Sequence, residues 1–169
     1  MNVSAKDSHS DQFSILVSEE PLDIPLLNCS IQSNQGESGA SVIFTGNVRV
    51  SHEEQNLTGM TLEHYPGMTE SLLTEIACQA IKRWQLNKVI VAHRVGYLSV
   101  GDPIVFVGAC ALHRLQAFKA AEYIMDYLKH KATFWKKEHY NINGNGKTKN
   151  VWVEAKQSDI DSLKRWKTT

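Results

Sequence analysis

The segment from residue 113 to residue 137 carries the densest set of side chains that could bind an anion or move a proton. An arginine beside a histidine, where a strand pattern meets a helix pattern, offers one anion both a guanidinium fork and free backbone N–H groups. His113 and Arg114 therefore predict an anion site, with a capping His113 and a solvated Arg114 as the alternative. The segment holds six cations, Arg114, Lys119, Lys129, Lys131, Lys136 and Lys137, against Glu122 and Asp126, a local net charge of +4.

Two of these lysines, Lys129 and Lys136, flank the apolar pair Phe134 and Trp135. A lysine near apolar walls and other cations can act as a proton donor or nucleophile. The alternative is a surface lysine favoured by the end of a helix. Arg49 lies at the end of a strand pattern, just before a loop, in an acidic half of the chain, where a salt bridge to Glu53 or Glu54 is the simplest explanation.

Hydrophobic periodicity predicts a single α+β domain with one mixed, mostly antiparallel sheet and two main amphipathic helices. Residues 1–12 are expected to form a flexible tail, and residues 13–169 the folded domain. The short connections favour antiparallel neighbours. We predict strands at 13–17, 41–50, 60–65, 88–96 and 103–112, helices at 22–32, from Gly67 to Trp84 and at 115–130, a hairpin of 134–140 and 151–155, and a final helix at 158–166 with Ser158 as N-cap.

The same patterns predict which side chains pack inside. One face of the helix at 115–130 is expected to be buried: Leu115, Phe118, Ala121, Ile124, Met125 and Leu128. The four tryptophans read as packing groups, and the three cysteines as buried, reduced thiols. His64 and His93 lie in strand patterns and are expected to be hydrogen-bonded core or edge residues.

Composition excludes several classes of function. The 169 residues carry no net charge, although residues 1–75 hold eleven acids and two bases, and residues 76–169 hold seven acids and sixteen bases. A neutral total argues against nucleic-acid binding by bulk charge. No apolar run approaches the ~20 residues that span a bilayer, and we expect a cytoplasmic protein. Without zinc-like Cys/His spacing or a nucleotide-binding motif, we predict no metal and no cofactor.

Six segments, taken in one order, resemble the large, catalytic subunit of molybdopterin synthase. They are FTGNVR (44–49), LEHYPGM (62–68), HRVG (93–96), GDPIVFVGACALHR (101–114), IMDYLKHKATFWKKE (124–138) and WVEAKQSD (152–159). The resemblance implies an α/β-hammerhead fold. It also implies transfer of sulfur from the C-terminal thiocarboxylate of a small ubiquitin-like subunit to cyclic pyranopterin monophosphate, which forms the dithiolene of molybdopterin. Two large subunits would form a central homodimer with one small subunit at each end, a heterotetramer.

Carried over residue by residue, the resemblance makes Lys129 and Lys136 catalytic. It assigns substrate binding to Asn47, Val48, Arg49, His113, Arg114, Lys136, Lys137 and Glu138. The family often has lysine at the position of Asn47, and arginine at that of Lys156. The chief alternative is a non-catalytic scaffold that binds a ubiquitin-like tail or a phosphorylated metabolite.

Overall fold

The computed structural model describes residues 12–32, 36–50, 56–132, 134–142, 147–153 and 162–166. These residues form three α-helices, eight strands and a short 3-10 helix, which confirms the predicted α+β class. The strands divide between two four-stranded sheets and not into one as predicted. The predicted tail, except residue 12, and the predicted cap Ser158 lie outside the described residues.

Sheet A forms the body of the domain. Its order is β1 (Phe13–Ser18), β4 (Lys88–Arg94), β6 (Pro103–Ala111) and β2 (Ala40–Asn47). β1 runs parallel to β4, and the other neighbours are antiparallel. The central strands are buried without a break from Val89 to His93 and from Val105 to Ala111. Such continuous apolar runs are typical of strands covered on both faces.

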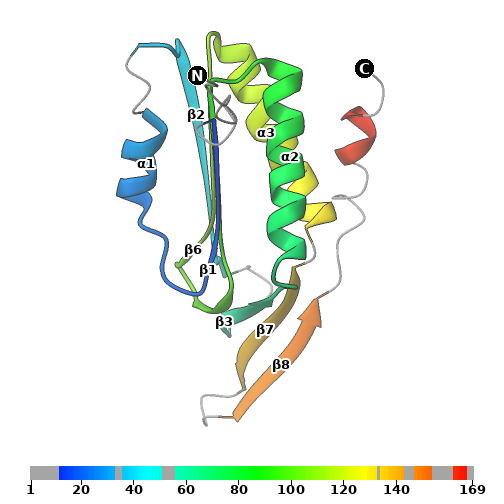
Figure 1. The fold of residues 1–169 in the computed structure, drawn as a ribbon. Coiled ribbons are helices and arrows are strands. Elements are labelled where there is room, and N and C mark those ends of the chain that lie inside the picture. Colours follow the sequence, from blue (N-terminus) through cyan, green and yellow to red (C-terminus); the bar gives the residue numbers. More distant parts are fainter. Residues whose placement is uncertain are drawn as a thin grey trace, which may run out of the picture.

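Helices cover both faces of sheet A, as Figure 1 shows. α2 (Met68–Trp84) and α3 (Arg114–Lys131) lie on one face, and α1 (Ile24–Gln32) lies on the other. Leu73 and Ile124 join the larger core, between the helix pair and the sheet. Ile31 of α1 packs with Phe106 in a second cluster on the opposite face. No helix of the described residues is both long and apolar enough to cross a membrane.

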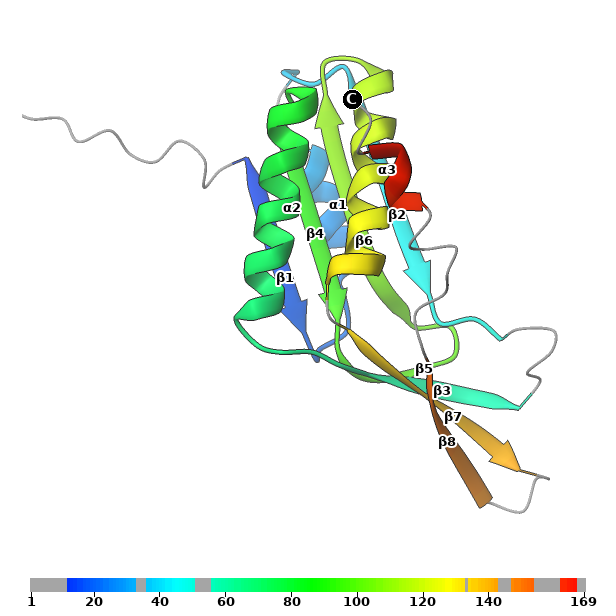
Figure 2. The same ribbon diagram turned by 90° about the vertical axis from the view of Figure 1, so that its right-hand side faces the viewer.

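Sheet B extends from one end of the body (Figure 2). Its strands are β5 (Gly96–Ser99), β3 (Leu57–Glu63), β7 (Trp135–Ile142) and β8 (Lys147–Val153), all antiparallel. β7 and β8 confirm the predicted hairpin. The predicted strand 88–96 is β4, which ends two residues earlier, at Arg94; β5, which starts at Gly96, was not predicted as a separate strand. Gly96 has φ +74°, a conformation that glycine adopts without steric cost.

The buried face of α3 differs from the prediction. Leu115 and Phe118 are 63% and 62% exposed. Ala121, Ile124 and Leu128 are buried as predicted, and Ala117, which was not predicted, is buried with them. Alanines let a helix approach a sheet closely, whereas the prediction gave most weight to the large side chains. Leu115 and Phe118 lie on an adjacent flank of the same helix.

Two further packing predictions are partly wrong. Trp84 and Trp166 pack together edge-on, but Trp135 and Trp152 are 51% and 52% exposed on sheet B. All three cysteines are free thiols, and only Cys110 is buried; Cys29 is exposed and Cys78 half-buried. An exposed face of a sheet or helix is not distinguished from a buried one by composition alone.

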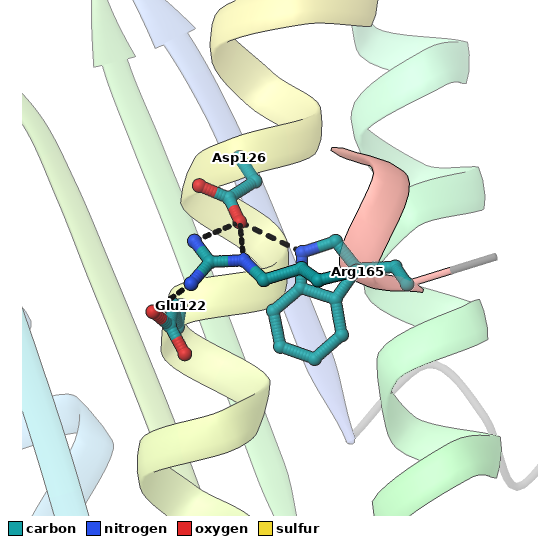
Figure 3. A network of polar contacts seen from close by, with 4 residues as sticks. Glu122, Asp126 and Arg165 are labelled. Carbon is teal, nitrogen blue, oxygen red and sulfur yellow. Dashed lines mark hydrogen bonds and ion pairs between the residues drawn. The ribbon is translucent and has the colours of Figure 1, made fainter. Parts of the chain in front are cut away.

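The 3-10 helix η1 (Leu163–Trp166) docks on α3 through a polar network (Figure 3). The Arg165 guanidinium lies 2.6 Å from Glu122 Oε1 and 2.6 Å from Asp126 Oδ2. Trp166 Nε1 donates to the same Asp126 oxygen at 2.7 Å. This turn is the described part of the predicted final helix, and it fixes residues 162–166 on the outer side of α3.

We predict that Asp126→Ala releases η1. One Asp126 oxygen accepts hydrogen bonds from both Arg165 and Trp166, so its loss removes most of the side-chain hydrogen bonds that hold η1 on α3. Tryptic cleavage after Arg165 should accelerate about fivefold, as expected for losing an exposed ion-pair network worth ~1 kcal/mol. Glu122→Ala removes a single bond and should have a smaller effect. Equal cleavage rates in wild type and Asp126→Ala, measured by mass spectrometry, would contradict this role.

Candidate active site at the end of sheet A

Lys129 and Lys136 lie on either side of the connection between α3 and β7 (Figure 2). α3 ends at Lys131 and β7 begins at Trp135, so this stretch of chain reaches at most about 14 Å. Lys129 is exposed in the last turn of α3, and Lys136 is half-buried at the start of β7. We call this region, defined by Lys129, Phe134 and Lys136, the α3–β7 junction. The fold thus brings both predicted catalytic lysines to one end of sheet A.

The junction is anchored by a ring stack between Phe134 and His93. Their centroids are 3.7 Å apart and the rings are tilted by 10°. His93 is 4% exposed, and its Nδ1–H donates to the backbone carbonyl of Arg94 at 2.8 Å. Burial lowers the pKa of His93 from 6.5 to about 4; the bond to Arg94 acts in the opposite direction, and His64 lowers the pKa slightly further. The prediction of a hydrogen-bonded core histidine is confirmed for His93.

Lys136 is paired with a buried carboxylate. Its Nζ lies 2.7 Å from Glu138 Oε1, and Glu138 is 8% exposed. The hydroxyl of Tyr140 donates to the other oxygen, Oε2, at 2.5 Å. Sequence reasoning missed Tyr140. The available signal was the spacing of 136, 138 and 140, which places alternate residues of a strand on one face.

Lys137 lies on the opposite face of sheet B. Its Nζ is 3.5 Å from Glu63 Oε1 and 4.2 Å from the centre of the Trp152 ring. Strand alternation explains this placement, because successive side chains point to opposite faces. The structure therefore separates Lys137 from its sequence neighbour Lys136.

The stretch from Asn47 to Arg49 lies between the two sheets. Val48 is 2% exposed and packs with Met60 and Leu62 of β3. These two residues stand opposite Glu138 and Lys136 in the β3–β7 register, so the stretch adjoins the face that carries Lys136. Asn47 and Arg49 are exposed on either side of the buried Val48. Glu53 and Glu54, the alternative partners for Arg49, lie outside the described residues.

The turn that holds Val48 is itself held by Asp102. Val48 N–H donates to the Asp102 carbonyl at 2.9 Å, and Gly101 N–H donates to the Val48 carbonyl at 2.8 Å. The Asp102 carboxylate accepts from Ser99 N–H at 3.0 Å and from Arg94 at 2.8 Å. These two donors lower the pKa of Asp102, the Ser99 bond contributing most. Val48 is thereby clamped by backbone bonds at a charged turn.

His113 and Arg114 lie at the other end of α3. His113 occupies the N-cap position, but its side chain makes no capping hydrogen bond. Lys129 lies fifteen positions after Arg114 in the helix, a rise of about 22 Å. Within one protomer the structure therefore does not bring His113 and Arg114 to the α3–β7 junction. Both are exposed, beside the exposed apolar residues Leu112, Leu115 and Phe118.

A cavity of about 500 Å³ lies apart from these residues, between α2, α3 and η1. Arg83, Trp84, Lys119, Arg165 and Trp166 line it. Glu122 and Asp126 already neutralise Arg165 there, and Arg83 donates to the Trp166 carbonyl. It includes none of the predicted site residues. No group of three potential metal ligands occurs among the residues that the structure describes.

Comparisons with known proteins identify the family. A family model described as MoaE protein matches residues 17–131. The molybdopterin synthase catalytic subunit of Yersinia pestis is 52% identical over 130 residues, which are 77% of this chain and 82% of the relative. Molybdopterin cofactor biosynthesis protein E from Burkholderia multivorans superposes with a TM-score of 0.74 at 36% identity, covering 92% of this chain and 97% of that one.

A complex of subunits 1 and 2 of molybdopterin-converting factor from Helicobacter pylori has the same fold, with a TM-score of 0.65 at 22% identity. The match covers 84% of this chain and 90% of that one. Fold and relatives together define a class of enzyme, the catalytic subunits of molybdopterin synthases. This chain belongs to the MoaE protein family. The resemblance and the prediction of an enzyme are confirmed.

We predict that His93 makes folding stability depend on pH. Its folded pKa lies below its unfolded value, so its stabilisation is complete above pH 6.5 and is lost as pH falls toward 4. Between pH 7.5 and 5 the loss should be about 2 kcal/mol. His93→Phe keeps a ring against Phe134 and removes the titration. Urea unfolding at several pH values should show wild type losing free energy of unfolding relative to the variant as pH falls; a difference in free energy that stays constant with pH would be inconsistent with this origin.

Proposed function

We propose that the chain transfers sulfur from the C-terminal thiocarboxylate of a small ubiquitin-like subunit to cyclic pyranopterin monophosphate, as a molybdopterin synthase catalytic subunit. The observation that carries the proposal is the placement of Lys129 and Lys136 at one junction, next to the stretch 47–49. The names of the relatives and the two-subunit Helicobacter pylori complex support it. We further propose that residues 13–169 act as one catalytic domain.

The proposed reaction needs positive charge beside two anionic groups, the cyclic phosphate of the substrate and the thiocarboxylate of the small subunit. The substrate brings a cyclic phosphate, for which Arg49, His113 and Arg114 are the proposed ligands. The incoming tail brings an anionic thiocarboxylate, which a cationic junction attracts. Lys137, on the other face of sheet B, would meet the partner or substrate only from that side.

The proposed reaction has two stages for each sulfur. The thiocarboxylate sulfur forms a bond to a side-chain carbon of the pterin, while Lys129 gives a proton to the oxygen that leaves that carbon. The tail's acyl group is then bound to the product through sulfur. Water breaks this acyl–sulfur bond and releases the tail as a carboxylate. Lys136 stabilises negative charge at the reacting centre, and a second charged subunit must follow for the second sulfur.

The site is proposed to form between two copies of the chain. About 22 Å of helix separates Arg114 from Lys129, so a phosphate at one junction would be held by the partner's His113 and the partner's Arg114. Apolar side chains 61–63% exposed surround this end of α3: Leu112, Leu115 and Phe118. An exposed apolar patch of this kind is typical of a protein–protein contact. If two α3 helices packed antiparallel about a two-fold axis, Arg114 of each copy would lie opposite Lys129 of the other copy.

We place the reaction in the cytoplasm. All three cysteines are free, and Cys29 is exposed. Free, exposed thiols suit a compartment that keeps thiols reduced. The alternative, a scaffold that binds without chemistry, is separated from the enzyme by a single-turnover assay, because it would yield no dithiolene.

We predict that Lys129→Ala abolishes sulfur transfer but leaves folding and binding of the small subunit intact, because Lys129 is exposed and supports no core packing. Single-turnover assays with thiocarboxylated partner and pterin precursor would measure the transfer, and calorimetry the binding. Lys136→Ala should weaken the same step. Normal turnover by Lys129→Ala would remove this lysine from the mechanism.

We also predict that two defective variants restore each other when mixed. Arg114→Ala should mainly raise the substrate concentration needed. In a mixed dimer of Arg114→Ala and Lys129→Ala, one of the two sites is intact. After subunit exchange at low substrate concentration, activity should reach about one quarter of wild type, because half of the dimers carry one whole site each. Activity no higher than the average of the two separate variants would show that each site belongs to a single copy.

A further inference from the structure

We infer that Tyr140 is a positioning residue for Lys136, acting through Glu138. The inference rests on the proposed function, and it assigns different roles to Lys129 and Lys136. The chain of contacts runs along one face of β7, from the Tyr140 hydroxyl to Glu138 Oε2 and from Glu138 Oε1 to Lys136 Nζ at 2.7 Å. Strand alternation places these three residues on the same face.

Burial makes the Glu138 carboxylate sensitive to its partners. Glu138 is 8% exposed, whereas the Lys136 side chain is 34% exposed. A buried carboxylate needs hydrogen bonds to replace lost water. Each of its oxygens has a donor, Tyr140 on one and Lys136 on the other. With both oxygens engaged, the carboxylate cannot rotate without breaking a charge-assisted bond.

The Tyr140 ring fixes the position of its hydroxyl. It packs against the cluster of Val48, Leu57, Met60, Leu62 and Leu98. Leu98 is fully buried, and Val48 belongs to the proposed substrate-binding stretch. The ring therefore ties Glu138 to the same apolar support that holds residues 47–49. Lys136 and the stretch keep a constant relative position because both rest on this cluster.

The arrangement assigns different tasks to the two lysines. Lys136 is held as an oriented positive charge, bound at its amino group to a buried carboxylate. Lys129, in the exposed last turn of α3, transfers the proton in the proposed reaction. A misplaced Lys136 would lower the rate of the chemical step and leave substrate binding by Arg49 and the partner's Arg114 unchanged.

Tyr140→Phe tests the inference, since it removes the hydroxyl and keeps the ring. We expect about a tenfold lower kcat, the effect of losing one hydrogen bond to a charged group, with KM within about twofold of wild type. Glu138→Gln should lower kcat as well, and adding Tyr140→Phe to it should cost nothing further, because Tyr140 acts through Glu138. Tyr97→Phe, on the same sheet but exposed, is the matched control and should match wild type.

Several outcomes would overturn the inference: unchanged kcat in Tyr140→Phe, additive effects in the double variant, or a rise in KM alone. Competitive acetylation by limiting acetic anhydride gives a readout that needs no turnover. The labelling of Lys136 relative to exposed Lys119 should rise roughly threefold in Tyr140→Phe, as expected for loosening a partly exposed ion pair. An inactive wild type would refute the proposed function, whereas an active wild type with unchanged labelling and kcat in Tyr140→Phe would refute only the role of Tyr140.

Discussion

The short connection between α3 and β7 is the constraint on which the candidate site depends. It joins the helix that carries Lys129 to the strand that carries Lys136. Phe134, just before β7, stacks on His93, a neutral ring buried in the central strand β4. The stack ties the first residues of sheet B to the core of sheet A. The packing of Val48 against Met60 and Leu62 of β3 is a second tie between the two sheets, and together the two contacts hold Lys136 near the end of α3.

Strand alternation then decides what each charge near the junction can do. β7 carries Lys136 and Lys137 side by side in sequence, but one points to the face shared with Val48 and the other to the exposed face with Trp152. Their carboxylate partners differ accordingly. Lys136 meets the buried Glu138, and Lys137 meets the half-exposed Glu63. A basic pair that appears as one feature in the sequence is two features in space, with different solvation and different partners.

Most of the elements were predictable because their periodicity is strong, as in α2 and in the buried runs of β4 and β6. The buried face of α3 was predicted in part: Ala121, Ile124 and Leu128 are buried as expected, but Leu115 and Phe118 are exposed and Ala117 takes their place in the contact. β5 was missed because it starts at Gly96, one residue after β4 ends, with no polar loop between the two strands. Local charge density drew attention to Lys129 and Lys136, and the family resemblance identified them as the catalytic lysines. The predicted helix at 115–130 already implied that His113 and Arg114 lie about a helix length from Lys129, and α3 confirms it.

The length of α3 determines whether one copy of the chain can assemble the whole site. α3 is one straight element of eighteen residues packed along sheet A, so its ends cannot approach each other without breaking the core. If one phosphate is to meet both ends, two helices must supply them. A two-fold dimer brings the two ends together through one surface of the chain. The start of α3 in one copy then lies next to the end of α3 in the other copy. The apolar side chains at the start of α3 are exposed in the single chain. The dimer contact would bury them. Association and catalysis would then depend on the same contact, and a monomer would bring only Arg49 to Lys129 and Lys136, without His113 and Arg114.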